Sequence, residues 1–322
     1  MKHTKEELSA LQSLPLSEKV LRTQTRIIEW YIKHKGNVYV SFSGGKDSTV
    51  LLHLVRQIYP EVPAVFVDTG LEFPEVKTHV KTFDNVVILR PKMTFPQVLE
   101  KYGWCYPGKD VARVVYYARR GSAWALNKLN GVDNDGKKSK FKQRYKKWRF
   151  LTDSPFLISD MCCHIMKKAP MHEYVKETGR EPYIGTMAAE SKMREDAWIK
   201  TGCNSFDGKN PRSAPLSFWT EQDVLQYIVD NNLPIPYVYG DIVRKGEKLI
   251  TTGEPRTGCM FCPVGCHLDK TNRWIRMRYT HPKIYEYCME RLGLREFLEY
   301  IGKHLHVDFF SEQLSLFDGE QA

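Results

Sequence analysis

The segment SFSGGKDSTVLLHLV (residues 41–55) decides the fold that we expect for this chain. The β-branched and aromatic run NVYVSFS (37–43) predicts a strand, and the apolar residues of 47–59 recur at helical spacing. Gly44 and Gly45 lie between the strand and the helix. Glycine can adopt backbone angles that are unfavourable for other residues and lets backbone amides approach an anion. The following helix directs free N–H groups and the positive end of its dipole to the same point. The segment therefore predicts a phosphate-binding turn.

The polar residues of this turn supply further contacts for a phosphate. Lys46 adds a cation, and Ser43, Ser48 and Thr49 can donate hydroxyl hydrogen bonds. Neither the GxxxxGK[ST] loop nor a GxGxxG turn is present. An ordinary strand-to-helix turn is the alternative, but the combination of lysine, aspartate and two serines favours nucleotide binding. We expect Lys46 and Asp47 to be catalytic.

The segments around this turn predict the fold class. Strands are expected at 64–70 and 85–91 with a helix between them, and the first 35 residues are expected to be helical. This alternation predicts an α/β protein with a doubly wound parallel sheet, which binds ligands beyond the carboxyl ends of its strands. We expect N-terminal helices (1–35), a nucleotide-binding domain (36–240) with a basic insertion (105–150), a cysteine-rich helical region (241–308) and a flexible tail (309–322).

Composition limits the class of protein. The 322 residues are 42% hydrophobic, which is enough for a sizeable core. The sequence contains no apolar run of about 18 residues and no secretory signal, so we expect a cytoplasmic protein without a membrane partner and with reduced thiols.

The positive charge is concentrated in one stretch. Residues 109–149 hold thirteen Lys and Arg against three Asp, which equals the net charge of +10 of the whole chain. Phe141, Tyr145 and Trp148 interleave with these cations, and aromatic side chains can stack on bases. The stretch predicts a nucleic-acid interface; a solvated basic surface that binds nothing is the alternative.

Two compact cysteine groups predict a metal centre. DMCCHIMKKAP (160–170) contains Cys162 and Cys163, and RTGCMFCPVGCH (256–267) contains Cys259, Cys262 and Cys266. Thiolates at these spacings can hold an iron–sulfur cluster or a zinc ion, with Lys167, Lys168 and Arg256 offsetting its charge. We expect Cys105, Cys203 and Cys288 to be core or surface thiols, although Cys203 could be a spare ligand.

Four motifs in order resemble one family. SGGKDS (43–48), VDTGLEFPEV (67–76), GTMAAESKMRE (185–195) and PLSFWTEQDVLQYI (215–228) are similar to segments of the phosphoadenosine-phosphosulfate (PAPS) reductase branch of the PP-loop ATP pyrophosphatases. The resemblance covers roughly residues 36–300. It implies an adenine nucleotide alpha hydrolase-like fold.

The resemblance also implies the ligands. It implies a nucleotide, either ATP or the sulfonucleotides PAPS and APS, together with Mg²⁺. It also implies a [4Fe–4S] cluster whose favoured ligands are Cys162, Cys163, Cys259 and Cys262. Cys266 is a competing ligand by local spacing, and zinc is the alternative metal. The nucleotide-binding residues that it implies are Ser43, Gly44, Gly45, Lys46, Asp47, Ser48, Asp68, Thr69, Gly70, Glu72, Gly185, Glu190 and Arg194.

Two departures from the family separate the functional hypotheses. Met187 stands where the family has an arginine, and no cysteine follows Cys288, although PAPS reductases carry a catalytic cysteine near their C-terminus. We therefore expect an enzyme that adenylates a nucleic acid for sulfur transfer, releasing AMP and pyrophosphate. A true sulfonucleotide reductase and a non-catalytic, nucleotide-sensing DNA-binding protein are the alternatives.

The tail SEQLSLFDGEQA (311–322) suggests a protein partner. Gln313, Leu314, Leu316 and Phe317 resemble the pentapeptide by which bacterial DNA enzymes bind the sliding clamp. Apolar side chains on a C-terminal segment can enter a groove while the glutamine fixes the register. A final amphipathic turn folded back on the core is the alternative. A clamp partner favours DNA over tRNA as the substrate.

We predict that a peptide spanning residues 309–322 binds the bacterial sliding clamp with a Kd on the order of micromolar, about −8 kcal/mol, because few apolar anchors contribute. Isothermal titration calorimetry measures it, with the Leu316→Ala and Phe317→Ala peptides as controls. Absence of heat at high micromolar peptide, or equal binding by the control peptides, would contradict the prediction.

Overall fold

The computed structural model describes residues 3–207, 210–269 and 272–311. It divides into two compact units: unit 1 is Met1–Pro91 with Ala169–Met260, and unit 2 is Lys92–Lys168 with Phe261–Ala322. This division differs from the ranges expected from sequence, because the basic insertion joins the C-terminal helices in one unit. Gln313, Leu314, Leu316 and Phe317, which the sequence analysis expects to bind the clamp, lie outside the described residues.

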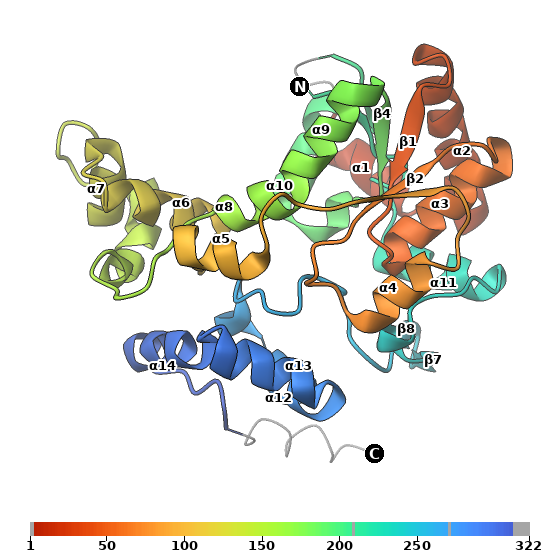
Figure 1. Ribbon diagram of the computed structural model, residues 1–322. Helices are drawn as coiled ribbons and strands as arrows, with labels where there is room; N and C mark the ends of the chain where they lie inside the picture. The colour runs from red at the N-terminus through yellow and green to blue at the C-terminus, as the bar shows by residue number, and fades with distance from the viewer. Residues whose placement is uncertain (1–2, 208–209, 270–271, 312–322) are drawn as a thin grey trace. The chain divides into compact units, whose positions relative to one another are not determined.

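Unit 1 is built on a six-stranded sheet in the order β3-β2-β1-β4-β6-β5 (Figure 1). All neighbouring strands are parallel except β5 and β6. The predicted α/β fold with a mostly parallel, doubly wound sheet is therefore confirmed. The strands are β1 (Val38–Ser41), β2 (Ala64–Val67), β3 (Val86–Leu89), β4 (Glu181–Ile184), β5 (Asn204–Ser205) and β6 (Arg212–Ser213).

Helices pack on this sheet because its central strands are apolar. Val38 and Val40 of β1 are fully buried, and α3 packs against β1, α2 and α11. A separate hairpin, β7 (Ile242–Lys245) and β8 (Lys248–Thr251), contacts α11. The helices of unit 1 are α1 (Lys5–Gln12), α2 (Leu16–Lys33), α3 (Lys46–Ile58), α4 (Pro74–Val80), α9 (Ala169–Thr178), α10 (Lys192–Thr201) and α11 (Glu221–Asp230), with short 3-10 turns η3 (Ala188–Glu190) and η4 (Tyr237–Tyr239).

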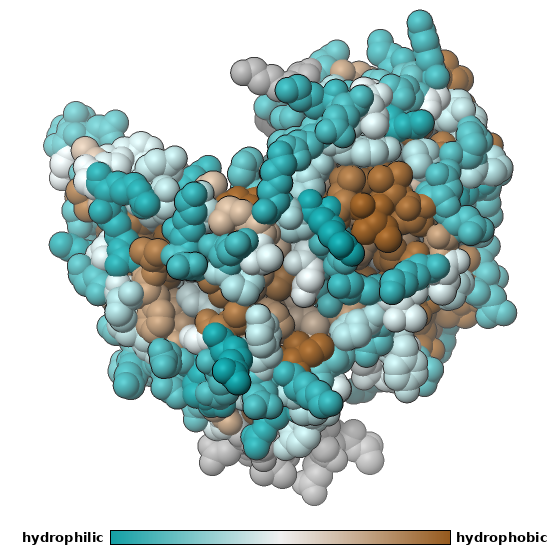
Figure 2. Space-filling view, in the orientation of Figure 1, coloured by the Kyte–Doolittle hydropathy of each residue, from teal (hydrophilic) through white to brown (hydrophobic). Residues whose placement is uncertain are grey.

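The other face of the sheet carries α9. Tyr39 and Val65 pack with Tyr174 of this helix, and Val87 and Leu89 of β3 lie partly buried at the margin of the cluster. The space-filling view shows an apolar area beside α9 over these strands (Figure 2). Strands β1 and β2 thus bury side chains on both faces, as expected of parallel strands, whereas Ile88 of β3 is exposed.

Unit 2 is helical in the residues that the structure describes, and its core is aromatic. Trp104 stacks on Phe297 with ring centroids 5.5 Å apart, and Tyr106 contacts the same ring edge-on. Its elements are α5 (Phe95–Tyr102), α6 (Lys109–Ala118), α7 (Ala123–Asn130), η1 (Lys140–Thr152), α8 (Met161–Cys163), η2 (His164–Lys168), η5 (Cys266–Leu268), α12 (Arg273–Thr280), α13 (Pro282–Glu286), η6 (Tyr287–Arg291) and α14 (Leu294–Leu305).

Across the described part of the chain, no helix combines the length and the apolar character that crossing a bilayer requires.

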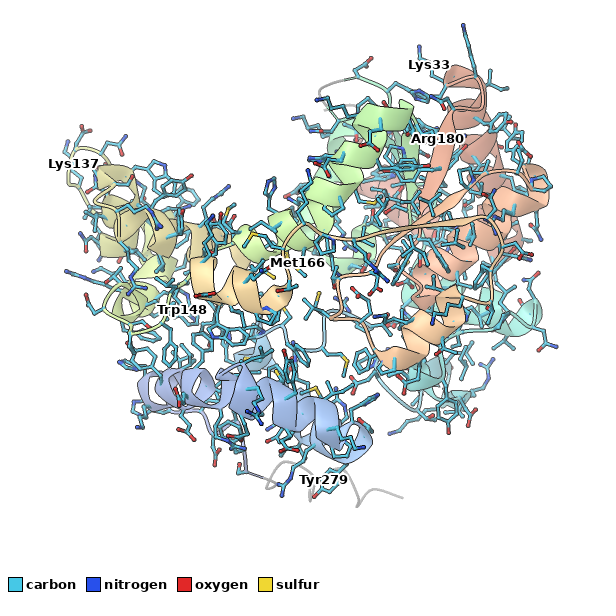
Figure 3. The ribbon with its side chains drawn as sticks, in the orientation of Figure 1. Lys33, Lys137, Trp148, Met166, Arg180 and Tyr279 are labelled. Atoms are coloured by element: carbon cyan, nitrogen blue, oxygen red, sulfur yellow. The ribbon has the colours of Figure 1, made fainter. Side chains whose placement is uncertain are left out.

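The basic insertion folds as α6, α7 and η1 around one acidic residue. Asp110 accepts a hydrogen bond from the Tyr145 hydroxyl and lies 3.3 Å from Lys128 Nζ. Tyr145 and Trp148 are only 2% and 5% exposed, so the expectation that they stack on bases is wrong. Their spacing along η1 directs them into the core, where Figure 3 shows Trp148 among packed side chains. Phe141, 86% exposed, is the aromatic residue of this set that remains accessible.

Candidate functional site

The turn from β1 into α3 has no room for side chains at its two glycines. Gly44 has a φ of +73°, and a Cβ there would lie 2.6 Å from a methyl group of Val80 in α4. A Cβ on Gly45 would lie 2.7 Å from the Thr257 hydroxyl and 2.9 Å from the Tyr239 hydroxyl. A side chain at either position would therefore force these neighbours to shift, and the positive φ of Gly44 also favours glycine there.

Hydrogen bonds fix the shape of the turn. The Ser48 hydroxyl donates to the Gly45 carbonyl at 2.9 Å and accepts the Ser43 N–H at 3.2 Å. The Tyr239 hydroxyl accepts the Lys46 N–H at 3.2 Å and lies 2.8 Å from the Thr257 hydroxyl. The remaining N–H groups of the first turn of α3 have no partner within the helix and can receive an anion.

Lys46 supplies a buried cation at the start of α3. Its side chain is 5% exposed, and its ammonium lies 3.0 Å from Asp47 Oδ1 and 3.5 Å from Glu221 Oε1. Burial alone would lower its pKa, but Asp47, Tyr239 and Glu221 outweigh burial and raise it. Lys46 is therefore charged at neutral pH, held by two carboxylates. Glu221 comes from the first turn of α11, which the Thr220 side chain caps.

The segment after β4 closes the site from the other side. Gly185 approaches α3 so closely that a Cβ would lie 3.3 Å from the Asp47 carbonyl oxygen. Glu190 accepts a hydrogen bond from the Met187 N–H at 2.9 Å and pairs with Arg194 of α10. Met187 is buried, 3% exposed, at the position where the resemblance led us to expect an arginine. This segment thus contributes one cation, Arg194.

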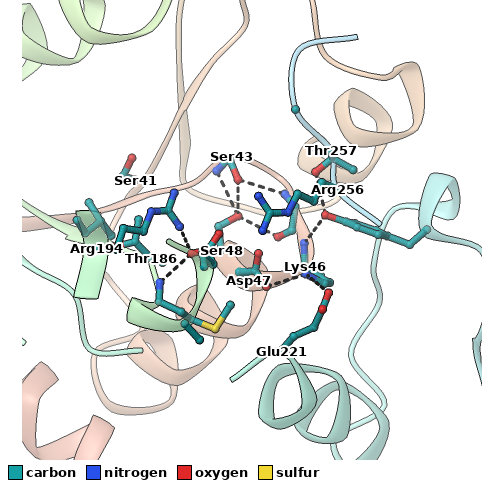
Figure 4. Close-up of a pocket in the computed structure, with 18 residues that line it drawn as sticks. Ser41, Ser43, Lys46, Asp47, Ser48, Thr186, Arg194, Glu221, Arg256 and Thr257 are labelled. Atoms are coloured by element: carbon teal, nitrogen blue, oxygen red, sulfur yellow. Dashed lines mark hydrogen bonds and ion pairs between the residues drawn. The ribbon is translucent and has the colours of Figure 1, made fainter. Parts of the chain in front are cut away.

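Arg256 is a second guanidinium in the site, and the sequence analysis assigned it elsewhere. It was expected to offset charge near the cysteines, but it lines the same cavity as Lys46 and Arg194. Burial lowers the pKa of Arg194, and the nearby charge of Arg256 lowers it further. Figure 4 shows both guanidinium groups pointing into the space beside α3. Among the described residues Arg256 forms no ion pair with a carboxylate, and it is exposed, so its guanidinium can receive an anion.

The cavity that these residues enclose measures about 490 Å³, within the range of small-ligand sites. It brings together Ser43, Gly45, Lys46, Asp47, Ser48, Gly185, Glu190 and Arg194 from the sequence-based set. It adds Ser41, Ile184, Thr186, Met187, Ala189, Glu221, Tyr239, Arg256, Thr257 and Gly258.

The segment after β2 does not line this cavity. Asp68 lies 2.8 Å from Lys77 Nζ and accepts the Gly70 N–H, while the Thr69 hydroxyl donates to Glu72 at 2.7 Å. Burial would raise the pKa of Asp68, but Lys77 holds it below its ordinary value. Since β2 is the neighbour of β1, this ordered loop lies at the same carboxyl edge of the sheet.

Four thiols influence one another in unit 2. Burial raises the pKa of Cys105, and the neighbouring Cys163, Cys262 and Cys162 raise it further. The sequence analysis expected Cys105 to be a core or surface thiol, so this neighbourhood was missed. Burial also raises the pKa of Cys266 to about 12, although Arg273 opposes this.

These thiols do not form a metal centre by geometry. Among the described residues, no three Cys, His, Asp or Glu side chains are placed to hold one metal ion. Cys259 belongs to unit 1, whereas Cys162, Cys163, Cys262 and Cys266 belong to unit 2. The cluster therefore stays a prediction, and no step of the chemistry is derived through it.

A mostly parallel sheet with a cationic, glycine-lined turn at the end of β1 defines the class of α/β nucleotide-binding proteins. The model of the phosphoadenosine phosphosulfate reductase domain matches residues 37–104 and 123–268. This chain belongs to that family.

Curated relatives differ in their activities. Adenosine 5'-phosphosulfate reductase of Staphylococcus epidermidis is 26% identical over 255 residues, 77% of this chain and 81% of the relative. Sulfate adenylyltransferase subunit 2 of Streptomyces lavendulae is 26% identical over 231 residues, 68% of this chain and 63% of the relative. An uncharacterized protein of Methanocaldococcus jannaschii is 25% identical over 285 residues, 83% of this chain and 51% of the relative. The chain thus spans only half to two thirds of two of these relatives.

A solved structure also resembles the chain. The PAPS reductase of Candida auris, determined as a phosphate complex, covers 78% of this chain and 99% of its own, with 16% identity and a TM-score of 0.40.

We predict that Arg256→Gln raises the Kd for ATP about tenfold, because a charge-assisted hydrogen bond to phosphate is lost. Isothermal titration calorimetry measures it. Arg244→Gln is the matched control: it removes the same charge from the exposed strand β7 of the same unit. Equal affinity of the Arg256→Gln and Arg244→Gln variants would contradict the placement of phosphate.

Proposed function

We propose that this protein is an adenylyl-transferring enzyme that splits ATP between its α- and β-phosphates. The observation that carries the proposal is the convergence of Lys46, Arg194 and Arg256 on the amino end of α3. Three cations and a helix N-terminus match a polyphosphate better than a single phosphate group. Family membership supports an adenine nucleotide as the ligand.

The reaction balances with an oxygen nucleophile. The acceptor oxygen attacks the α-phosphorus and gives up its proton to solvent, the bond to the α–β bridging oxygen breaks, and pyrophosphate leaves with the electron pair. AMP is then bonded to the acceptor oxygen. It is released with that oxygen when a sulfur nucleophile of the thiolate or sulfide class forms a bond to the acceptor carbon. Arg194 and Arg256 would stabilise charge on the phosphate oxygens, and Lys46 would stabilise the departing pyrophosphate. Asp47 already holds the buried Lys46 ammonium and Glu190 already holds the partly exposed Arg194 guanidinium, so both cations are in position before this charge develops.

Mg²⁺ fits the donor set of this site. Asp47 and Glu221 both line the cavity and both lie within 3.5 Å of the Lys46 ammonium. Hard carboxylate oxygens together with nucleotide phosphates are the usual ligands of this ion, which would neutralise pyrophosphate as it leaves. The same two residues would bind the ion while Lys46 contacts phosphate.

A nucleic acid is the acceptor that we propose. Lys137, Lys138, Lys140, Arg144, Lys146, Lys147 and Arg149 of unit 2 are all exposed. Such a row of cations releases counterions from a phosphate backbone, and Phe141 offers an accessible ring. DNA is favoured over RNA if the tail binds the sliding clamp as proposed.

Sulfonucleotide reduction is the second candidate. The relatives named as APS and PAPS reductases favour it, as does the group of neighbouring thiols around Cys105. In that reaction a thiolate would attack the sulfur of the sulfonucleotide, and AMP would leave from APS or adenosine 3',5'-bisphosphate from PAPS. A second thiol would then form a disulfide with the first and release sulfite. A nucleotide-sensing protein without turnover is a third possibility.

We predict that the enzyme converts ATP to AMP and pyrophosphate and that a nucleic acid accelerates this turnover. Lys46→Ala and Asp47→Ala should abolish the turnover, because both side chains act on the phosphates. Coupled pyrophosphate detection with chromatography of the nucleotides measures it, with Arg244→Gln as the active control. Unchanged turnover in both alanine variants refutes the assignment. Sulfite from PAPS or APS with a thiol reductant establishes the second candidate, and binding without products the third.

We also propose that four of Cys162, Cys163, Cys259, Cys262 and Cys266 hold a [4Fe–4S] cluster. We predict that anaerobically purified protein is brown and contains iron and acid-labile sulfide, because thiolates in two compact groups suit such a cluster. Elemental and sulfide analysis measures it, and Cys262→Ser should lose the colour. Stoichiometric zinc without sulfide would refute the proposal.

A further inference from the structure

A second cavity of about 290 Å³ lies beside the nucleotide site in unit 1. Its walls come from the segment after β4, from α10 and from the short strands β5 and β6. It shares Ile184, Thr186, Met187 and Arg194 with the nucleotide cavity. The shared wall places a ligand in this second cavity next to a ligand in the first.

Two buried donors line this cavity without a partner. Trp198 is 4% exposed and Ser217 is 5% exposed, and neither the indole Nε1 nor the hydroxyl forms a hydrogen bond. Both donors lie near the Cys203 thiol and lower its pKa against the burial that raises it, but a thiol is a weak acceptor and leaves both donors unsatisfied. Buried donors without acceptors are rare and costly, so they point to a ligand that supplies the acceptor.

The chemistry of the walls narrows the class of ligand. Arg194 and Arg212 add cationic donors, and none of the described residues lining the cavity is an aspartate or glutamate. Met187, Met193 and several alanines form the remaining walls. A small oxyanion would leave most of these apolar side chains without contact. The site suits a flat group with apolar faces and acceptor atoms at its edge.

We propose that this cavity binds a carbonyl-bearing nucleobase of the acceptor polynucleotide, read by the Trp198 indole and the Ser217 hydroxyl. Enzymes that act on bases hold them in such pockets, with hydrogen bonds to the base edge and apolar contacts to its faces. The inference rests on the proposed function, because the neighbouring nucleotide would be the adenylyl donor. Arg194, on the shared wall, would contact both ligands.

The variant that tests the proposal is Trp198→Phe, which removes the indole N–H and keeps an aromatic ring. Trp30→Phe is the matched control, because Trp30 is fully buried, its Nε1 also lacks a partner, and it does not line this cavity. We expect Trp198→Phe to weaken binding of a short single-stranded DNA containing all four bases about tenfold, with Trp30→Phe unchanged. The Kd for ATP should stay unchanged in both, because neither tryptophan lines the nucleotide cavity.

Cys203 gives a local readout that is independent of turnover, since it lines the cavity and is half-buried; because burial raises its pKa, alkylation is measured at alkaline pH. We expect saturating DNA to slow alkylation of Cys203 by iodoacetamide, measured by site-resolved mass spectrometry, in wild type and Trp30→Phe. At the DNA concentration that saturates wild type, Trp198→Phe should lose most of this protection.

The outcomes separate the two claims. If DNA binds and stimulates pyrophosphate release but Cys203 alkylation is unchanged, the base pocket is refuted and the proposed function stands. If Trp198→Phe and Trp30→Phe bind DNA equally, the reading of a base by Trp198 is refuted. If neither DNA nor RNA of the same sequence binds, the proposed nucleic-acid acceptor is refuted and the base pocket with it.

Discussion

The structure of the site depends on the close packing of one turn. Gly44 and Gly45 are clamped between α4 on one side and Tyr239 and Thr257 on the other, with no space for a Cβ at either position. This packing orients the amino end of α3 toward the cavity and places the Lys46 ammonium beside the carboxylates of Asp47 and Glu221. The chemistry that we propose follows from that orientation, because the helix end and the cations meet at one point.

The cavity is lined by as many carboxylates as cations, and the ion pairs among them hold two of the cations in position without a ligand. Lys46 and Arg194 each have carboxylate partners within the cavity, whereas Arg256 has none among the described residues. The paired cations are fixed in place before a nucleotide arrives, so little reorganisation is needed at the moment of reaction. The unpaired guanidinium is the part of the site whose charge a phosphate would satisfy.

Much of the fold could be predicted from sequence because the signals were local. The alternation of strands and helices from residue 37 to 91 was confirmed, since apolar periodicity and glycine turns report directly on backbone geometry. Arg256 could not be found in this way, because it comes from an irregular segment about two hundred residues from Lys46. Tyr145 and Trp148 were misjudged for a related reason: a basic, aromatic stretch does not reveal which rings face the core. Burial is a property of tertiary packing.

The central claim is that the site splits ATP between the α- and β-phosphates. Exchange of radioactive pyrophosphate into ATP tests it most directly, because label enters ATP only when that bond is broken and reformed on the enzyme. The account predicts exchange that requires ATP, Mg²⁺ and the acceptor and that is lost in Lys46→Ala. Conversion of ATP to ADP and phosphate without any exchange would contradict it.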